Sequence, residues 1–541
     1  MVDILQNTLE NTFKLSEFRE PQKTVCQLVL KGQNVLFVAP TGKGKSLCYQ
    51  LPGIILGTTI VISPLIALID DQYTKINKLG LKAERLHSGM KDSDLARVLQ
   101  EYLRGELNFL FIAPERLATD FCDTLRSHPP ALIAVDEAHA ISAFGEYRPD
   151  YRLLTHRLPP NVPIIALTAT ATPKVQLDIL EQLNMPEAQL IAHGFRRDNI
   201  AIQIQDTSGK EREAKVASYL RGSSTKPAIV YCGTRKQTES MAALLKKQGH
   251  KCEGYHAGMT PKARTEVQER FMSEDLDVIT CTCAFGMGID KSNIRTVLHL
   301  SMPGSVEAYY QEIGRAGRDG LPSKAVMFCN YEDKARQMWF VDKSYPSVEY
   351  LQMVFNVLTD EPQDSDVIQY KIPSIDKETI GTALGKLVTY EAALKSHQQY
   401  VKGPKPFRGP YLEARKYSLN KLEAMYQYTQ DKGCRMLGFL NYFGDTNDDY
   451  APCNMCDNCL KKATKTPEAL KAAVTAAAPK VATKSEGFAP GTYVSHTKYG
   501  IGKVEKSEPG SMGNRQATLR FSDGIRRVIM EKYLKEVTDK T

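Results

Sequence analysis

The chain has 541 residues, of which 42% are hydrophobic and 24% are charged. At roughly 100–200 residues per domain, this length predicts about three or four domains. No apolar stretch reaches a membrane-spanning length, and the N-terminus has no basic segment followed by an apolar block. Length and composition exclude collagen-like, disordered, secreted disulfide-rich and membrane proteins, so we expect a soluble cytoplasmic protein.

The net charge of +8 is concentrated at the C-terminal end of the chain. Residues 461–541 contain 16 Lys and Arg against 8 Asp and Glu, which leaves the first 460 residues neutral on balance. A basic segment attracts polyanions such as nucleic acids, although the same composition also suits a purely solubilising tail.

Apolar, strand-like runs alternate with helical stretches in two successive parts of the chain. In the first part the runs are residues 34–40, 58–64, 107–114, 131–137 and 162–170. In the second part they are residues 227–232, 251–258, 277–282, 296–301 and 325–330. Buried parallel strands that alternate with helices predict two tandem α/β lobes, residues 1–208 and 209–340, with a cleft between them. Ligands of such sheets bind at the carboxyl ends of the strands.

The pattern changes after the second lobe. We expect a helical segment at 341–410, further helices beside a cysteine cluster at 411–460, a flexible Ala- and Lys-rich linker at 461–486 and a small β domain at 487–541.

A glycine-rich loop follows the first apolar run and precedes a helical stretch. Its sequence is Ala39-Pro40-Thr41-Gly42-Lys43-Gly44-Lys45-Ser46. Such a loop wraps backbone N–H groups around nucleotide phosphates, while its second lysine, Lys45, bridges phosphate oxygens and Ser46 binds Mg²⁺. Residues 41–46 therefore predict a nucleoside triphosphate site.

A second motif, Asp136-Glu137-Ala138-His139, follows another apolar run. We expect Asp136 to hold Mg²⁺ and Glu137 to polarise the attacking water as general base, with His139 completing the catalytic group. Either motif alone can arise by chance, but the two together predict an NTPase.

Arg19 and Gln22, which precede the loop in the sequence, are candidate contacts of the nucleotide. The amide of Gln22 offers one donor and one acceptor, which match the N6 and N7 edge of adenine. This residue therefore favours ATP as the nucleotide.

The second lobe supplies its own candidates for contacts with the nucleotide. Gly288 and Asp290 follow one strand, and the segment Gln311 to Gly320 contains Arg315 and Arg318. Because arginines three residues apart share one face of a helix, we expect both to face the nucleotide and neutralise the transferring phosphoryl group, with Gln311 beside them. The alternative is a pair of surface arginines bound to acidic neighbours.

Four of the twelve cysteines form a cluster, whereas the other eight are scattered through apolar segments as small core residues. The four are Cys434, Cys453, Cys456 and Cys459. Four thiolates with this spacing fit a closed, tetrahedral, structural Zn²⁺ site, and an iron–sulfur site is the alternative.

The ordered motifs FREPQ, APTGKGKS, VDEAH, ALTATAT, AFGMGID and QEIGRAGRDG resemble those of superfamily-2 helicases, and most closely those of the RecQ family of DNA helicases. The cysteine cluster, with NYFGD at 441–445 between its first and second cysteines, is similar to the RecQ zinc-binding subdomain. The resemblance covers residues 10–340 and 411–460. It implies RecA-like lobes and ATP-driven translocation from 3′ to 5′ along one DNA strand, with separation of the duplex ahead.

The resemblance also implies DNA contacts from three residues near strand ends: Ser63, Arg116 and Thr282. A further contact is expected from the aromatic loop after His139. This loop carries Phe144 where the family usually has Trp, and it is one residue shorter, yet Phe144, Tyr147 and Arg148 retain faces that stack on bases. Lys43 is a second departure, because family loops usually have glycine there.

The C-terminal half departs further from the family. A winged helix typically follows the zinc module in RecQ proteins and is not recognisable after Leu460. Residues 345–403 are instead inserted before the cysteines, and they suit either a helix-turn-helix with a wing or a plain helical spacer. Residues 487–541 resemble the small Tudor or SH3-like barrels of some bacterial helicases, which predicts either a site for a protein or nucleic-acid partner or a passive cap.

These features together predict an ATP-dependent DNA helicase of RecQ type that uses ATP, Mg²⁺ and Zn²⁺ and acts on single-stranded and forked duplex DNA in repair or recombination. Two alternatives stay open: a DNA-stimulated translocase that does not separate strands, and a non-enzymatic binding protein. RNA is an alternative to DNA as the nucleic acid along which the protein moves. In a bacterial cell the protein is expected to associate with the nucleoid.

Overall fold

The computed structural model describes two compact units, residues 1–465 and 466–541. In the first unit it describes residues 4–64, 66–118, 121–142, 154–286, 291–396, 398–445 and 448–464. In the second unit it describes residues 488–490, 492–496, 500–509, 515–521, 526–530 and 535–536. Among these residues, no helix combines the length and apolarity that crossing a membrane requires.

The first lobe is built on a seven-stranded parallel sheet with strand order β3-β4-β2-β5-β6-β1-β7. Its strands are β1 (Val35–Val38), β2 (Thr59–Ile62), β3 (Ala83–Leu86), β4 (Phe109–Ile112), β5 (Leu132–Val135), β6 (Ile164–Thr168) and β7 (Gln189–Ala192). Every residue of β1, β2, β4, β5 and β6 is buried, as continuous apolar runs predict for strands covered on both faces. The sheet's helices are α1 (Ile4–Phe13), α2 (Gln22–Leu30), α3 (Leu47–Leu56), α4 (Ile66–Lys78), α5 (Asp92–Leu103), α6 (Phe121–Ser127), α8 (Leu154–Arg157) and α9 (Pro173–Gln182), with short 3₁₀ turns η1 (Pro114–Ala118) and η2 (Ala138–Ile141).

The second lobe has a six-stranded parallel sheet with strand order β10-β11-β9-β12-β13-β8. Its strands are β8 (Ile200–Asp206), β9 (Ala228–Tyr231), β10 (Cys252–Tyr255), β11 (Val278–Cys281), β12 (Thr296–His299) and β13 (Ser323–Cys329). Its helices are α10 (Gly209–Tyr219), α11 (Arg235–Lys247), α12 (Pro261–Met272) and α13 (Val306–Ile313), with a short 3₁₀ turn η3 (Ser223–Thr225).

The expected boundary between the lobes, after residue 208, was wrong by one strand. Strand β8 lies before that boundary but pairs with β13 at the edge of the second sheet. Its side chains alternate between buried and partly exposed positions, a pattern that an edge strand of either sheet would show. The connection between the lobes is therefore residues 193–199.

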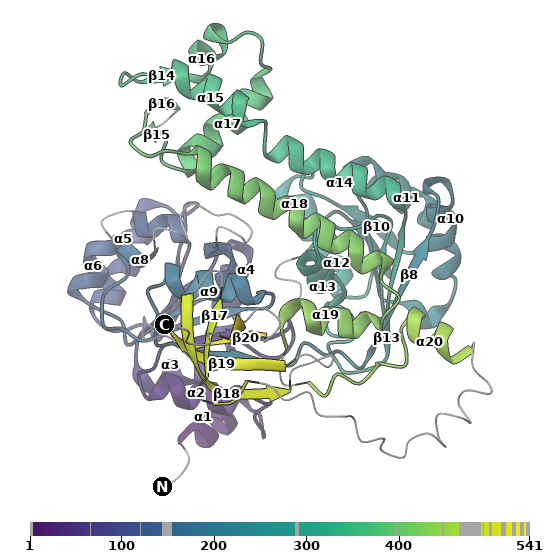
Figure 1. The fold of residues 1–541 in the computed structure, drawn as a ribbon, viewed down its shortest axis with the longest axis horizontal. Helices are drawn as coiled ribbons and strands as arrows, with labels where there is room; N and C mark the ends of the chain where they lie inside the picture. Colours follow the sequence, from purple (N-terminus) through teal and green to yellow (C-terminus); the bar gives the residue numbers. More distant parts are fainter. Residues whose placement is uncertain are drawn as a thin grey trace. The chain divides into compact units, whose positions relative to one another are not determined.

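Two long helices continue from the second lobe, α14 (Tyr331–Ser344) and α18 (Arg408–Gln430), and they pack against each other. The inserted residues between them form α15 (Val348–Val357), β14 (Gln363–Asp364), α16 (Ser365–Lys371), α17 (Lys377–Thr389), β15 (Ala393–Ser396) and β16 (Gln399–Lys402). The three strands make an antiparallel sheet in the order β14-β16-β15. Figure 1 shows these elements gathered at one end of the α14–α18 pair. Helix, strand, two helices and a two-stranded hairpin follow each other as they do in a winged helix.

The cysteine module follows α18 with two short helices, α19 (Arg435–Phe443) and α20 (Asp457–Thr464). The helices expected beside the cysteines are thus present, and they are separate, because α18 ends at Gln430 and α19 begins after Cys434. The residues expected to form the linker lie mostly outside the described part of the chain.

The second unit contains a five-stranded antiparallel sheet, in the order β20-β19-β18-β17-β21. Its strands are β17 (Tyr493–His496), β18 (Gly500–Pro509), β19 (Arg515–Phe521), β20 (Arg526–Met530) and β21 (Lys535–Glu536). Val494, Val504, Ala517 and Leu519 are its buried apolar residues. The small antiparallel β domain expected at the C-terminus is confirmed.

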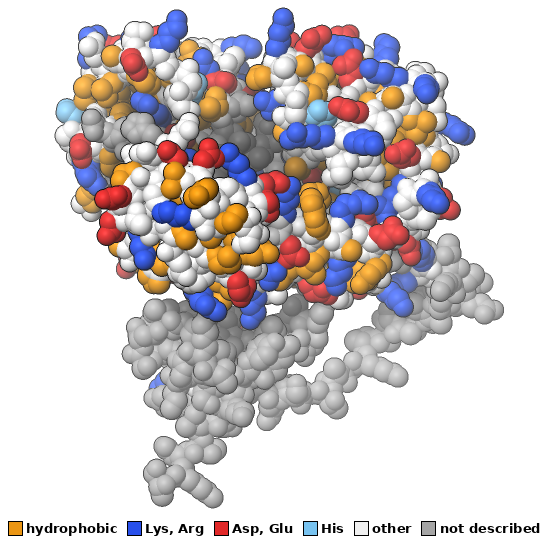
Figure 2. Space-filling model, turned by 90° about the horizontal axis from the view of Figure 1, so that it is seen from above, with side chains coloured by type: hydrophobic (Ala, Val, Ile, Leu, Met, Phe, Trp, Pro, Cys, Tyr) orange, Lys and Arg blue, Asp and Glu red, His pale blue; other side chains and the backbone are white. Residues whose placement is uncertain are grey.

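Figure 2 shows Lys and Arg side chains interspersed with Asp and Glu over the visible face of the described residues. This mixture agrees with the neutral charge balance of the first 460 residues. Attraction of a polyanion to this unit therefore depends on particular sites and not on a general basic field.

Candidate nucleotide site and cysteine cluster

The phosphate loop joins β1 to α3, as expected, and contains Thr41 as well as the two glycines. Gly42 and Gly44 have φ angles of 85° and 72°, in the left-handed region that favours glycine. Lys45 is turned into the loop, where its ammonium donates to the carbonyl of Ala39 at 2.8 Å and that of Pro40 at 3.3 Å. Burial lowers the pKa of Lys45, and the nearby carboxylates of Glu137 and Asp136 oppose this shift.

The acidic pair lies beside the loop, directly after β5. Burial and the neighbouring charge of Glu137 raise the pKa of Asp136. For Glu137, burial is outweighed by the hydrogen bond from His139 and by the positive charges nearby, so its pKa is lowered. Glu137 also has a left-handed φ of 48°, which is rare for a residue with a side chain. The two neighbouring carboxyl groups therefore differ in pKa, which is raised for Asp136 and lowered for Glu137.

A chain of polar contacts leads from this acidic pair to the second lobe. The Nδ1 atom of His139 lies 3.3 Å from Glu137 Oε2 and 2.9 Å from Thr168 Oγ1. Two residues further on, Thr170 Oγ1 accepts a hydrogen bond of 2.7 Å from Gln311 Nε2. The hydroxyl groups of Thr168 and Thr170 thus lie between the carboxylate of Glu137 and a side chain of the other lobe.

The two arginines are also brought to the site, although not on one helix as expected. Helix α13 ends at Ile313, and Arg315 and Arg318 lie in the turns beyond it, because Gly314 ends the helix and Gly317 adopts a φ of 57°. Arg315 is 7% exposed and donates to the carbonyl of Gly286. Its charge contributes to the lowered pKa of Glu137.

Arg318 lies against the phosphate loop itself. A Cβ atom added to Gly42 would be 3.4 Å from Arg318 Cγ. The charge of Arg318 also contributes to the lowered pKa of Lys45, after burial. Groups from both lobes therefore face the same space.

Arg19 and Gln22 contact the loop from its other side. Arg19 Nη1 donates to the carbonyl of Gly42 at 3.0 Å. Gln22 is buried, and its Nε2 donates to the carbonyls of Lys43 and Gly44, each at 3.1 Å, while its Oε1 accepts from the backbone N–H of Arg19. Gln22 thus braces the loop, and its adenine-reading role stays a prediction.

The side chain of Lys43 extends towards the connection between the lobes. Its Cε lies 3.7 Å from a Cβ built on Gly194. Burial and the charges of Arg197 and Arg19 lower the pKa of Lys43. The unusual residue of the loop therefore lies among cations beside the inter-lobe connection.

The expected DNA contacts are only partly described. Ser63 follows β2 and is buried, Arg116 lies in η1 beyond β4, and Thr282 follows β11. All three lie beyond the carboxyl ends of parallel strands, where ligands of such sheets bind. The other expected DNA contacts, Phe144, Tyr147 and Arg148 of the aromatic loop, lie outside the described residues. The same holds for Gly288 and Asp290, which were expected to contact the nucleotide.

The four clustered cysteines converge in space. The Sγ atoms of Cys434, Cys453, Cys456 and Cys459 all lie within 4.8 Å of one another. The backbone N–H of Cys453 donates to Cys434 Sγ at 3.3 Å, and that of Arg435 to Cys456 Sγ at 3.4 Å. Four sulfur donors with N–H groups directed at them suit Zn²⁺, which takes thiolates in tetrahedral geometry.

A buried ion pair lies next to the cluster. Arg435, next to the first cysteine, contacts both carboxylate oxygens of Asp457 at 3.0 and 3.1 Å, and its Nη1 donates to the carbonyl of Tyr428 at 2.7 Å. This pair joins the start of α19 to the start of α20 and to the end of α18. Sequence reasoning gave it no role, since no local pattern connects residues so far apart.

Two tandem parallel-sheet lobes that face one site are the architecture of a helicase, and the family matches assign this chain to superfamily 2. Residues 19–179 match the DEAD/DEAH box helicase family, residues 211–320 the helicase conserved C-terminal domain, and residues 397–460 the RecQ zinc-binding family. The chain is 33% identical over 475 residues to a Bacillus subtilis protein named "Probable ATP-dependent DNA helicase RecS", a match that covers 84% of this chain and 92% of that one. The chain belongs to the RecQ family of helicases.

Other relatives are longer. The chain is 34% identical over 459 residues to the ATP-dependent DNA helicase RecQ of Haemophilus influenzae, covering 84% of this chain and 63% of that one. With the RecQ protein of Bacillus subtilis the identity is 38% over 351 residues, covering 64% of this chain and 59% of that one. The chain thus spans about three fifths of the length of these two relatives.

Among solved structures, the helicase MrfA bound to DNA and AMPPNP superposes with a TM-score of 0.52 at 20% identity, covering 76% of this chain and 62% of that one. The Mycobacterium smegmatis helicase Lhr bound to single-stranded DNA and AMP-PNP gives a TM-score of 0.51 at 18% identity, covering 77% and 62%. These likenesses show the fold.

Proposed function

We propose that the chain is an ATP-dependent DNA helicase that moves from 3′ to 5′ on single-stranded DNA and unwinds duplex DNA, in repair or recombination. The observation that carries the proposal is the convergence of Lys45 and Glu137 of one lobe with Arg315 and Arg318 of the other. The names of the relatives, ATP-dependent DNA helicases, support it.

The roles of the residues follow from their positions. The turn from Gly42 to Ser46 and the ammonium of Lys45 hold the phosphates of ATP. Ser46 and Asp136 would hold Mg²⁺, which neutralises phosphate oxygens. Glu137, kept ionised by its neighbours, orients the attacking water and accepts its proton. The arginines stabilise the charge that develops on the transferring phosphoryl group.

Hydrolysis is coupled to movement through the inter-lobe contacts. Loss of the γ-phosphate removes the anion that both lobes share, and the lobes then separate. The hydrogen bond between Thr170 and Gln311 links this opening to the hydroxyl run of β6. Alternate release and rebinding of DNA near Ser63, Arg116 and Thr282 would convert opening and closing into steps along the strand.

A set of three measurements tests the proposal. We expect single-stranded DNA to stimulate phosphate release, forked duplexes with a 3′ tail but not a 5′ tail to be unwound, and Lys45→Ala to abolish both activities. Comparing the stimulation of phosphate release by single-stranded RNA and by single-stranded DNA shows along which nucleic acid the protein moves. Hydrolysis that persists unchanged in the Lys45→Ala protein would remove the mechanism.

A second candidate is a DNA-stimulated translocase that does not separate strands efficiently. The shortened aromatic loop with Phe144 in place of the usual Trp favours it, because a smaller ring stacks less strongly on bases. Triplex displacement without fork unwinding would select this candidate.

The remaining modules extend the proposal. The cysteine module binds a structural Zn²⁺, and the β domain of the second unit binds a protein or nucleic-acid partner. The protein acts in the cytoplasm, in contact with the nucleoid if the cell is bacterial.

A further inference from the structure

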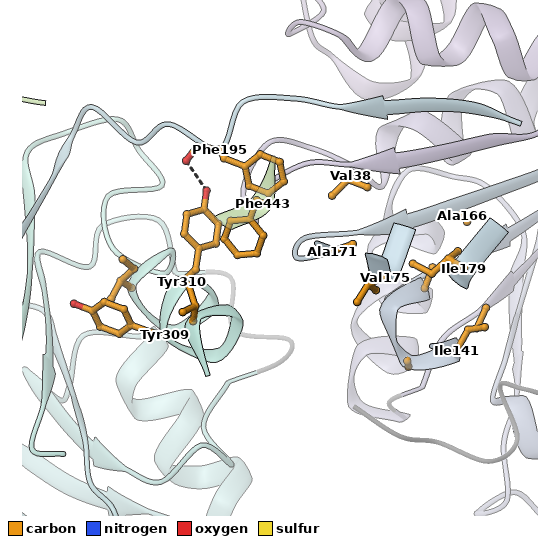
Figure 3. Packing of buried hydrophobic residues seen from close by; sticks show 14 of the residues in the cluster. Val38, Ile141, Ala166, Ala171, Val175, Ile179, Phe195, Tyr309, Tyr310 and Phe443 are labelled. Atoms are coloured by element: carbon orange, nitrogen blue, oxygen red, sulfur yellow. Dashed lines mark hydrogen bonds between the residues drawn. The ribbon is translucent and has the colours of Figure 1, made fainter. Parts of the chain in front are cut away.

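Helix α19 of the cysteine module ends at the connection between the two lobes. The ring of Phe443, its last residue, stacks on Phe195 of the connection with centroids 4.9 Å apart and planes inclined by 7°. The backbone N–H of Phe195 donates to Asp445 Oδ2 at 3.0 Å. All three residues are buried. Figure 3 shows the two rings face to face.

The same stack reaches the helix that precedes the arginines. Tyr310 of α13 donates its hydroxyl to the carbonyl of Phe195 at 2.7 Å, and its ring lies 5.0 Å from that of Phe443 (Figure 3). The next residue, Gln311, makes the hydrogen bond to Thr170 of the first lobe. Adjacent residues of α13 therefore carry the contact with the aromatic stack and the contact with the first lobe.

The end of α19 also contacts the first lobe directly. Gly444 ends the helix with a φ of 69°, and a Cβ added there would lie 2.8 Å from Pro173 Cγ, at the start of α9. Pro173 is only three residues beyond Thr170. The end of α19 thus contacts the first lobe, the second lobe and the connection between them.

An ion pair secures the connection to the same module. Arg196 makes two hydrogen bonds of 2.6 Å to the carboxylate of Asp448 and a third of 2.8 Å to the carbonyl of Ala451. The side chains of Arg196 and Asp448 are only 16% and 9% exposed, so the pair is shielded from solvent. Two consecutive residues of the connection, Phe195 and Arg196, are therefore held by the cysteine module.

We propose that Phe443 is a positioning residue for ATP hydrolysis, which holds the connection and α13 together so that Gln311 and the two arginines return to the nucleotide at each closure. The inference rests on the proposed function. Phe443 acts through its contact with Tyr310 and not through a contact with ATP or DNA. If the connection moved independently of α13, Arg315 and Arg318 would be displaced from the nucleotide when the lobes close. Small displacements of catalytic groups lower the reaction rate strongly.

The test compares Phe443→Leu with Phe109→Leu. Both phenylalanines are fully buried beside another ring, and Phe109 begins β4, whereas the phosphate loop follows the carboxyl end of β1 in the same parallel sheet. Phe443→Leu is expected to lower kcat for ATP roughly tenfold with KM for ATP and zinc content unchanged, while Phe109→Leu keeps kcat within about twofold. Equal kcat in the two variants, or a loss of kcat in proportion to lost zinc, would overturn the proposal.

Two further variants keep the test decisive if Phe443→Leu folds poorly. Asp448→Asn retains shape but weakens the bond to Arg196, and is expected to lower kcat in the same way. Combining Phe443→Leu with Gln311→Ala should cost less than the product of the single effects, because both act on one contact. A wild-type protein without ATPase activity would refute the proposed function. If the wild type is active and the effects of the two substitutions on kcat multiply in the double variant, only this inference is refuted.

Discussion

Replacing Arg315 by alanine should stop hydrolysis while leaving nucleotide binding largely intact. Arg315 is 7% exposed and is held by the carbonyl of Gly286, so its charge acts in a site from which water is mostly excluded. Charges act more strongly there than at the surface. Because the charge on the phosphoryl oxygens develops only as the bond breaks, the arginine stabilises the transition state more than bound ATP.

The magnitude follows from the role. Arginines that stabilise phosphoryl transfer raise kcat by about 10³–10⁵, and the lower limit corresponds to about 4 kcal/mol of transition-state free energy. We take the lower limit, since Arg318 remains in place against the phosphate loop. Arg315→Lys keeps the charge but changes the donor geometry, so an intermediate loss is expected.

Steady-state phosphate release at saturating single-stranded DNA measures kcat, and titration of a fluorescent ADP analogue measures nucleotide binding. Arg221→Ala, which removes an exposed arginine of the same lobe, is the control and should leave both unchanged. If Arg315→Ala retained more than about a tenth of wild-type kcat, or weakened ADP binding as much as it lowered kcat, a role confined to the transition state would be refuted.

Three other outcomes are expected. Gln22→Ala removes two hydrogen bonds to the phosphate loop, each worth about 1 kcal/mol, and should weaken ADP binding by roughly tenfold or more in the same titration. Asp333→Ala leaves the buried guanidinium of Arg212 without its carboxylate. The substitution should lower the free energy of unfolding of the second lobe by about 3–5 kcal/mol. Urea denaturation measures this change, and an unchanged midpoint would contradict it. Chelation of Zn²⁺ should increase amide exchange in residues 411–460 more than in either sheet, and Cys456→Ser but not Cys26→Ser should reproduce the effect.

The chemistry-bearing motifs could be predicted because each lies at the end of a continuous apolar strand. The loop after Val38 and the carboxylates after Val135 need only the local order of strand and turn to be recognised. The arginines lie near Glu137 and the phosphate loop, but the helix expected to carry them ends early, because Gly314 and Gly317 favour a turn.

What sequence reasoning missed depends on contacts between residues far apart in the chain. Phe195 and Phe443 stack across about 250 positions, and neither belongs to a periodic pattern that indicates the partner. Strand β8 was assigned to the wrong lobe for a related reason: its period-two pattern shows that it is an edge strand but not which sheet it joins. Strand β14, with only two residues, gives no sequence signal at all.

The position of the insertion explains how the chain carries an extra domain without disturbing the cysteine module. The inserted residues begin after the end of α14 and finish before the start of α18. Two contacts join these helix ends: Tyr411 donates its hydroxyl to the carbonyl of Pro346, and Arg415 pairs with Asp342 at 2.7 Å. The inserted residues bury their own apolar core, which includes Leu351. A domain whose ends meet and whose core is separate can be accommodated at the tip of a helix pair. The contacts of α19 with both lobes follow the other end of α18, so a substitution within the core of the inserted domain should leave the contacts of Phe443 unchanged.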